Sequence, residues 1–203
     1  MLRAIDSLGS GKAPGEDHLP GDLYRFEPAI WGPYINLRSN FTMKGHEIPK
    51  SWGGAIIIPI HKKGDVLVPG NHRPISLIDI LQRIFCCQVL FKLDDWITEE
   101  QILSPYQAGF RKKVSTIDQV FRLQLIVWKY IKLQKQHLYV AFVELKAAFD
   151  LVPRSMLWRS LGEMGVFYDL VNILERLHSQ KYAKVRWGKN GALTKAIPIA
   201  RGV

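Results

Sequence analysis

Two carboxylates, Glu144 and Asp150, stand six residues apart where an apolar run ends. Residues 138–143 are Leu-Tyr-Val-Ala-Phe-Val, so we predict a buried strand over 138–144 that ends on Glu144. A carboxylate in that position can hold a divalent cation for polymerase or nuclease chemistry. Asp150 follows the aromatic residue Phe149, and we interpret it as a cap for the next helix, with a direct catalytic role as the alternative.

The formal net charge of +10 lies entirely in the second half of the chain. Residues 1–100 contain 11 Lys/Arg and 12 Asp/Glu, whereas residues 101–203 contain 17 Lys/Arg and 6 Asp/Glu. The cations alternate with Trp, Tyr and Phe, which favours a polyanion whose phosphates meet the cations and whose bases stack on the rings. A basic surface that serves only solubility is the alternative.

The composition indicates a globular protein without a membrane or secretory address. Hydrophobic residues make up 47% of the chain, which is enough for a packed core. No apolar run reaches the roughly 18 residues that a membrane span needs, and the N-terminus lacks a signal-peptide pattern. Cys86 and Cys87 are adjacent, so we expect two thiols in a reducing compartment, the cytoplasm or the nucleus.

The elements that must position these residues alternate irregularly between helices and short strands, which predicts an α+β fold. Gly and Pro make residues 9–22 a loop. Residues 52–60 have the composition of a strand, and a turn with basic flanks follows over 61–74. The further expected elements are a helical stretch over 23–43 broken at Gly32-Pro33, a segment over 75–97 with helical spacing of its apolar residues, a helix that Ser115 and Asp118 begin and that runs to about Gln136, short helices over 154–165 and 169–180, and a hairpin with Asn190-Gly191 in its turn.

Several segments, taken in order, resemble the reverse transcriptase of LINE-type (non-LTR) retrotransposons. They cover nearly the whole chain, and their order carries more weight than any one of them. The segments are GKAPGEDHLPGDLYR (11–25), IPKSWGGAIIIPIHKKGD (48–65), HRPISL (72–77), SPYQAGFRKKVSTIDQVFRL (104–123), YVAFVELKAAFDLVPRSMLWRSL (139–161) and IPIARGV (197–203).

The resemblance implies the fingers and part of the palm of a right-hand polymerase. Residues 1–137 then form a fingers-like region, mostly helical with a β-hairpin near 54–74. Residues 138–203 form a partial palm that ends before the hairpin with the remaining catalytic carboxylates. The implied partners are an RNA template and a DNA primer, or an RNA–DNA hybrid, with no membrane.

The resemblance also implies roles for two residues near the predicted palm strand. Glu144 occupies the position of the family's first metal ligand, where Mg²⁺ or Mn²⁺ is bound. Phe149 matches the aromatic residue that lies under the sugar and excludes ribonucleotides. A core phenylalanine at a strand-to-helix corner is the alternative for Phe149.

Two groups of cations match positions that contact nucleotide or template in the family. Lys62, Lys63 and Arg73 correspond to fingers residues that meet the triphosphate and the template, and a solvated hairpin tip is the alternative. Cations in the GFRKK segment suit the template backbone, and a solvated charge run is the alternative. These cations are Arg111, Lys112 and Lys113.

Two departures from the family predict that this chain does not polymerise. Glu144 replaces an aspartate, and its extra methylene moves the carboxylate by about 1 Å, which Mg²⁺ with its strict octahedral geometry tolerates poorly. The sequence ends at Val203, before the family's Tyr/Phe-Ala-Asp-Asp hairpin. We therefore expect no productive binding of Mg²⁺ or Mn²⁺.

The resulting prediction is an inactive fragment of an RNA-directed DNA polymerase from a non-LTR retrotransposon. Three alternatives stay open: a non-catalytic nucleic-acid-binding module derived from it, a non-functional transposon remnant, and an enzyme that another polypeptide completes.

Overall fold

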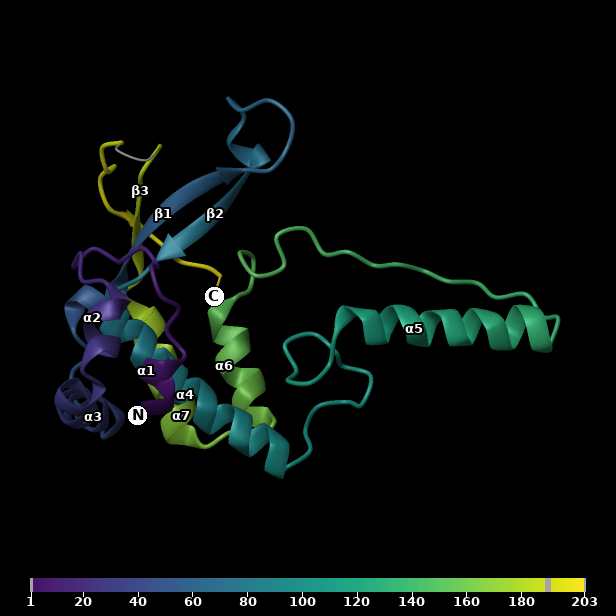
Figure 1. Ribbon diagram of the computed structural model, residues 1–203, viewed down its shortest axis with the longest axis horizontal. Coiled ribbons are helices and arrows are strands. Elements are labelled where there is room, and N and C mark those ends of the chain that lie inside the picture. The colour runs from purple at the N-terminus through teal and green to yellow at the C-terminus, as the bar shows by residue number, and fades with distance from the viewer. Residues whose placement is uncertain (1, 189–190, 203) are drawn as a thin grey trace. The chain divides into compact units, whose positions relative to one another are not determined.

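The computed structural model describes residues 2–188 and 191–202 (Figure 1). The chain divides into two compact units, Met1–Trp96 with Phe149–Val203, and Ile97–Ala148. The elements of the first unit are α1 (Leu2–Asp6), α2 (Gly21–Phe26), α3 (Pro28–Met43), the 3₁₀ turn η1 (Lys50–Gly53), β1 (Gly54–His61), the 3₁₀ turn η2 (Pro69–Asn71), β2 (His72–Leu77), α4 (Ile80–Glu99, which ends in the second unit), α6 (Arg154–Glu163), α7 (Tyr168–Ser179), β3 (Tyr182–Val185) and β4 (Ile197–Pro198). The second unit contains α5 (Thr116–Val127) and the π-helical turn η3 (Trp128–Leu133).

A small mixed sheet joins distant parts of the first unit. Its strand order is β2-β1-β3-β4, with β1 antiparallel to β2, parallel to β3, and β3 antiparallel to β4. Ile57 of β1 lies between Ser76 on one side and Val185 on the other. The described residues therefore form a mixed α/β fold, as the irregular order of predicted elements indicated. The hairpin expected near residues 54–74 extends to Leu77.

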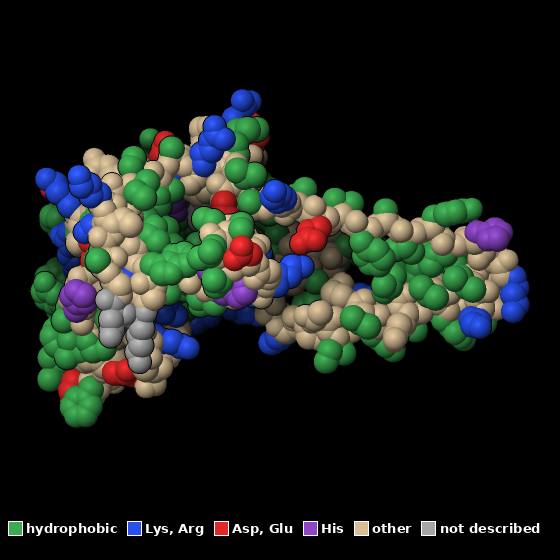
Figure 2. Space-filling model, turned by 90° about the horizontal axis from the view of Figure 1, so that it is seen from above, with side chains coloured by type: hydrophobic (Ala, Val, Ile, Leu, Met, Phe, Trp, Pro, Cys, Tyr) green, Lys and Arg blue, Asp and Glu red, His purple; other side chains and the backbone are tan. Residues whose placement is uncertain are grey.

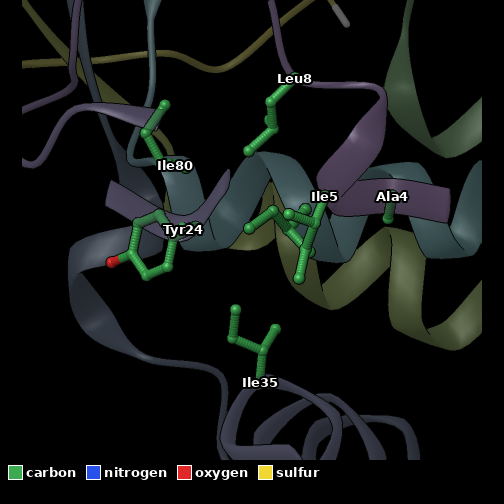
Figure 3. Packing of buried hydrophobic residues seen from close by; sticks show 7 residues of the cluster. Ala4, Ile5, Leu8, Tyr24, Ile35 and Ile80 are labelled. Atoms are coloured by element: carbon green, nitrogen blue, oxygen red, sulfur yellow. The ribbon is translucent and has the colours of Figure 1, made fainter. Parts of the chain in front are cut away.

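The core of the first unit lies between the short N-terminal helices and the start of α4. Ile5 of α1, Ile35 of α3 and Ile84 of α4 are almost fully buried, and Tyr24 of α2 packs with them (Figure 3). α1 has only five residues, so this packing and not its intrinsic helix propensity holds it in place. The Trp52 and Phe85 rings, with centroids 5.1 Å apart, join η1 to α4.

The capping box predicted from Ser115 and Asp118 is confirmed. The backbone N–H of Asp118 donates to Ser115 Oγ at 3.2 Å, and the backbone N–H of Ser115 donates to Asp118 Oδ2 at 2.7 Å. These two bonds satisfy backbone donors that have no partner inside the helix. The helix that they begin continues through η3 to Leu133, close to the expected end at Gln136.

We predicted that the helical stretch over 23–43 breaks at Gly32-Pro33, and this prediction is wrong. The break is at Glu27, and α3 begins at Pro28 and runs through Pro33 to Met43. Pro28 suits the first helical position because that residue needs no N–H partner. Pro33 removes one backbone hydrogen bond, and packing of the buried face of α3 against the core compensates for this loss.

The predicted strand over 138–144 is absent from the described structure, where residues 135–145 have no regular secondary structure. The side chains of Tyr139 and Phe142 are 92% and 84% exposed. A strand exists only when its backbone pairs with a neighbour, and no strand of the described sheet pairs with this segment. Figure 2 shows many hydrophobic side chains exposed along the second unit.

Two other predictions concern a helix end and a turn of the first unit, and two more concern the cysteines and membrane spans. Gly165, at φ +89°, follows the end of α6 as predicted. β3 and β4 pair antiparallel as the expected C-terminal hairpin requires, although Asn190 of the predicted turn lies outside the described residues. Cys86 and Cys87 are free thiols, and burial raises the pKa of Cys86. No described helix combines the length and the apolar character needed to cross a membrane.

Candidate nucleic-acid interface

The β1–β2 hairpin, whose backbone is seen in Figure 1, carries three of the predicted site cations at the end that holds its connecting loop. Lys62 and Lys63 directly follow β1, and Arg73 lies in β2 opposite Ile60. All three side chains are exposed. The structure records no ion pair for any of them among the residues that it describes. The hairpin therefore holds three cations close together in the fold and free to bind an anion.

The loop between β1 and β2 is fixed by its own hydrogen bonds. The Lys62 N–H donates to the Asn71 carbonyl at 2.8 Å, and Asn71 Nδ2 donates to the Asp65 carbonyl at 2.8 Å. Gly64 has φ +81°, and a Cβ there would lie 2.8 Å from Asn71 Nδ2, so glycine is required for this turn. The fixed loop reduces the backbone entropy that would be lost on binding, although the exposed Lys and Arg side chains keep their own rotamer freedom.

Three aromatic side chains beside these cations were missed in the sequence analysis. The His72 ring lies 5.3 Å from the His61 ring and 4.8 Å from the Trp187 ring, between centroids. His61 and His72 pair directly across the hairpin, so their contact follows from its register. Trp187 comes from more than 100 residues later, and the parallel pairing of β3 with β1 brings it to the same sheet. No local sequence pattern indicates that contact.

The loop that contains the GKAPGED segment contacts the sheet at β3. Glu16 Oε2 accepts from Lys184 Nζ at 3.3 Å, and Asp79 Oδ1 accepts from the Asp17 N–H at 3.3 Å. A Cβ on Gly15 would lie only 2.4 Å from the Asp79 backbone nitrogen. This close approach explains why glycine stands at that position. Burial raises the pKa of the Asp79 carboxyl, and the nearby charge of Asp17 adds to the effect.

Phe149 lies beside the C-terminal segment of the chain. Its side chain is 57% exposed, so it is not a buried core residue. Gly202, at φ +80°, lies so close that a Cβ there would be 3.1 Å from the Phe149 carbonyl oxygen. The Gly202 N–H donates to the Val152 carbonyl at 3.1 Å. The IPIARGV segment thus supports the backbone that carries Phe149.

Arg154 fastens this C-terminal segment to α6 and α7. Its Nε donates to the Gly202 carbonyl at 2.7 Å, and its Nη1 donates to the carbonyls of His178 and Ile199, each at 2.9 Å. Burial lowers the pKa of the Arg154 guanidinium. Arginine suits this position because its guanidinium presents several donors in fixed directions. Sequence reasoning did not single out Arg154, because its partners are backbone atoms from other elements.

Asp150 does not cap the following helix, contrary to our interpretation. α6 begins at Arg154 with Pro153 as its N-cap, and no side chain caps it. Asp150 lies three residues before that N-cap, in the turn over 146–151, and is too far along the chain to accept from the first turn of α6.

The three cations of the GFRKK segment belong to the second unit, before α5. Arg111 Nη1 donates to the carbonyls of Ser104 and Gln107 at 3.2 and 3.3 Å. These two hydrogen bonds stabilise the loop that contains Arg111. Lys112 and Lys113 follow it, and Lys113 has φ +63°. The structure thus gives Arg111 a local structural role beside its predicted contact with the template.

Glu144 lies in the exposed segment of the second unit that has no regular structure. Among the residues that the structure describes, no group of three or more His, Cys, Asp or Glu is arranged to hold a metal ion. A two-metal centre needs several carboxylates around two cations. The carboxylates of the described residues do not fit such a centre, so we derive no catalytic step through a metal.

A family model described as "Reverse transcriptase (RNA-dependent DNA polymerase)" matches residues 60–195. The chain belongs to this reverse transcriptase family. The match begins in β1 and includes the hairpin cations, Trp187 and both predicted palm carboxylates.

Three relatives confirm the resemblance to the reverse transcriptases of non-LTR retrotransposons. The "Probable RNA-directed DNA polymerase from transposon BS" of Drosophila melanogaster is 33% identical over 153 residues, which are 75% of this chain and 17% of that protein. The "RNA-directed DNA polymerase from mobile element jockey" of the same organism is 30% identical over 149 residues, 73% of this chain and 16% of that protein. The "Retrovirus-related Pol polyprotein from type-1 retrotransposable element R2" of Popillia japonica is 30% identical over 164 residues, 79% of this chain and 22% of that protein. The chain thus spans less than a quarter of the length of each of these reverse transcriptases.

Proposed function

We propose that this reverse transcriptase fragment binds an RNA template with a DNA primer through the basic end of its β1–β2 hairpin. The observation that carries the proposal is the position of Lys62, Lys63 and Arg73 on one fixed hairpin, exposed and without recorded ion pairs among the described residues. Cations in such an arrangement neutralise phosphates and release counterions.

The aromatic side chains beside the hairpin support a single-stranded part of the template as the ligand. Trp187 is half exposed and contacts His72, so its ring can stack on a base. Stacking tolerates any base, and phosphate contacts carry no sequence information. We therefore expect the affinity to depend strongly on salt concentration and only weakly on nucleotide sequence.

Fluorescence anisotropy of a labelled RNA–DNA primer–template, measured over a series of salt concentrations, tests this proposal. Replacing Lys62, Lys63 and Arg73 together by Gln should weaken binding and lower the slope of log K against log salt by about two to three, since each lost phosphate contact removes about one. The matched control replaces Lys12, Lys92 and Arg159, which are exposed elsewhere in the first unit. Equal loss of affinity in both triple variants would contradict a hairpin site.

We propose further that the whole chain is arranged as the fingers and part of the palm of a right-hand polymerase. Residues 1–137 would serve as fingers and residues 138–203 as part of a palm, with Arg111, Lys112 and Lys113 on the template backbone. Phe149 would lie under the sugar of an incoming nucleotide, and its exposed position beside Gly202 is compatible with that role. Such partners are found in the cytoplasm and the nucleus.

For the chain alone, we propose binding without polymerisation. Glu144 replaces the family's metal-binding aspartate, and the 203 residues contain no Tyr/Phe-Ala-Asp-Asp segment. Mg²⁺ or Mn²⁺ would need further carboxylates, from a longer protein or another polypeptide. Primer extension on an RNA template with either ion should yield no product, both in this chain and in its Glu144→Asp variant. Template-dependent incorporation by the chain alone would refute the proposal.

A further inference from the structure

Helix α3 exposes four of its large apolar residues to solvent. On its inner side Ile35 points into the core toward Ile5 and Tyr24 (Figure 3), and the partly buried Trp31 ring packs edge-on against the Tyr24 ring. The other buried residues of α3 are Gly32, Ser39 and Thr42. The outer side carries a stripe of four apolar residues, defined here as the α3 stripe, which are 68%, 61%, 71% and 45% exposed: Ile30, Tyr34, Leu37 and Phe41.

The residues of the α3 stripe recur at steps of four, three and four, so they lie on one face of the helix. The C-terminal end of the stripe is held in position, because the Phe41 ring stacks on His46 with centroids 3.8 Å apart and the Arg38 guanidinium lies over it. An apolar helix face of this kind, exposed and ordered, is typical of a surface that packs against another helix.

The α3 stripe is also symmetric about the centre of the helix, between Ile35 and Asn36. Ile30 and Phe41 are equally far from this centre, and so are Tyr34 and Leu37. An antiparallel copy of the helix would therefore place Ile30 of one copy opposite Phe41 of the other. It would likewise place Tyr34 opposite Leu37. A self-complementary surface of this kind is what a twofold dimer requires.

The charges at the two ends of α3 obey the same symmetry. Glu27 precedes the helix and Lys44 follows it, at equal distances from its centre. The antiparallel register brings Glu27 of each copy level with Lys44 of the other, so both ends gain an attraction.

We propose that α3 is a homodimer interface, at which the α3 stripe packs antiparallel on the α3 stripe of a second copy. The inference is independent of nucleic-acid binding, because none of its residues belongs to the hairpin. Four large side chains per copy make a small interface, so we expect a dissociation constant on the order of 1–100 μM.

Sedimentation velocity of the full chain, over a concentration range of about 1–200 μM, measures this equilibrium. Leu37→Glu should weaken dimerisation by about 100-fold or more, because the twofold axis makes the substitution count twice. Its exposed position means that folding should be retained, which far-UV circular dichroism checks. Leu67→Glu, at an exposed leucine of the hairpin loop, is the matched control and should leave the equilibrium unchanged.

A charge exchange tests the antiparallel register itself. The Glu27→Lys and Lys44→Glu variants should each dimerise more weakly than the parent chain, because each alone places like charges together. An equimolar mixture of the two should restore association, since every contact between positions 27 and 44 then joins opposite charges. Non-specific association through other exposed apolar residues does not respond in this way.

If the chain sediments as a monomer at all concentrations, the proposal is wrong, and the α3 stripe would then bind a different protein. Dimers that persist in Leu37→Glu, or a mixture that behaves like its separate components, would overturn it as well. Loss of the dimer in Leu37→Glu together with recovery in the mixture would establish the interface.

Discussion

At the scale of single residues, close backbone contacts decide which side chains this fold accepts. Gly15 lies in the GKAPGED segment, and a Cβ there would collide with the Asp79 backbone at 2.4 Å. Gly70, in the loop of the hairpin, has nothing within 4 Å of the same added atom. An added methyl group should therefore lower the free energy of unfolding at Gly15 but hardly change it at Gly70.

Gly15→Ala should lower the free energy of unfolding by about 1–3 kcal/mol, because the loop must move away from the start of α4. Gly70→Ala should change it by less than about 0.5 kcal/mol. Urea unfolding followed by tryptophan fluorescence compares the two variants. Equal effects at both positions would contradict the close approach of Gly15 to Asp79.

At the scale of elements, α5 depends on its capping box, since none of its residues is buried. Ser115→Ala should destabilise the first turn by about 1 kcal/mol. The bonds from the backbone and hydroxyl of Ser115 hold the pKa of the Asp118 carboxyl below its ordinary value. Because the folded state favours the carboxylate, this stabilisation is complete above the pKa of the unfolded chain and is lost as the pH falls through the folded value.

Amide hydrogen exchange in α5 measures both effects. Protection of the Asp118 amide should decrease on acidification in the parent chain, and the decrease should be smaller in Asp118→Asn. Asp169→Asn, in the first turn of α7, is a control because no side chain caps that helix. An unchanged acid dependence in Asp118→Asn would show that other carboxylates determine the stability of α5.

At the scale of the whole molecule, burial is concentrated in the first unit. Trp52 and Phe85 are buried there, whereas Phe110, Tyr139 and Phe142 of the second unit are almost fully exposed. Limited chymotrypsin digestion should therefore cut first within residues 97–148, which mass spectrometry of the early fragments reveals. First cuts beside Trp52 or Phe85 would contradict the division into two units.

The sequence alone determined the features that depend on neighbours along the chain. The hairpin with Lys62, Lys63 and Arg73, the Ser115 cap and the order of the family segments could all be predicted, because turn chemistry, capping and motif spacing are local. The break in the helical stretch at Glu27 was missed, since local rules treat Pro33 as a helix breaker and omit the core packing that keeps α3 intact.

Only the tertiary structure decided which distant residues meet. The parallel pairing of β3 with β1 brings Trp187 to His72, and Arg154 joins α6 to carbonyls near the C-terminus. The apolar run over 138–144 is a local pattern that the tertiary structure overrides. Its composition is that of a strand, but a strand forms only when another backbone supplies its hydrogen bonds, and no other described strand does so. The physical reason is that local preferences cost little to override, whereas pairing and burial between distant segments supply most of the stability.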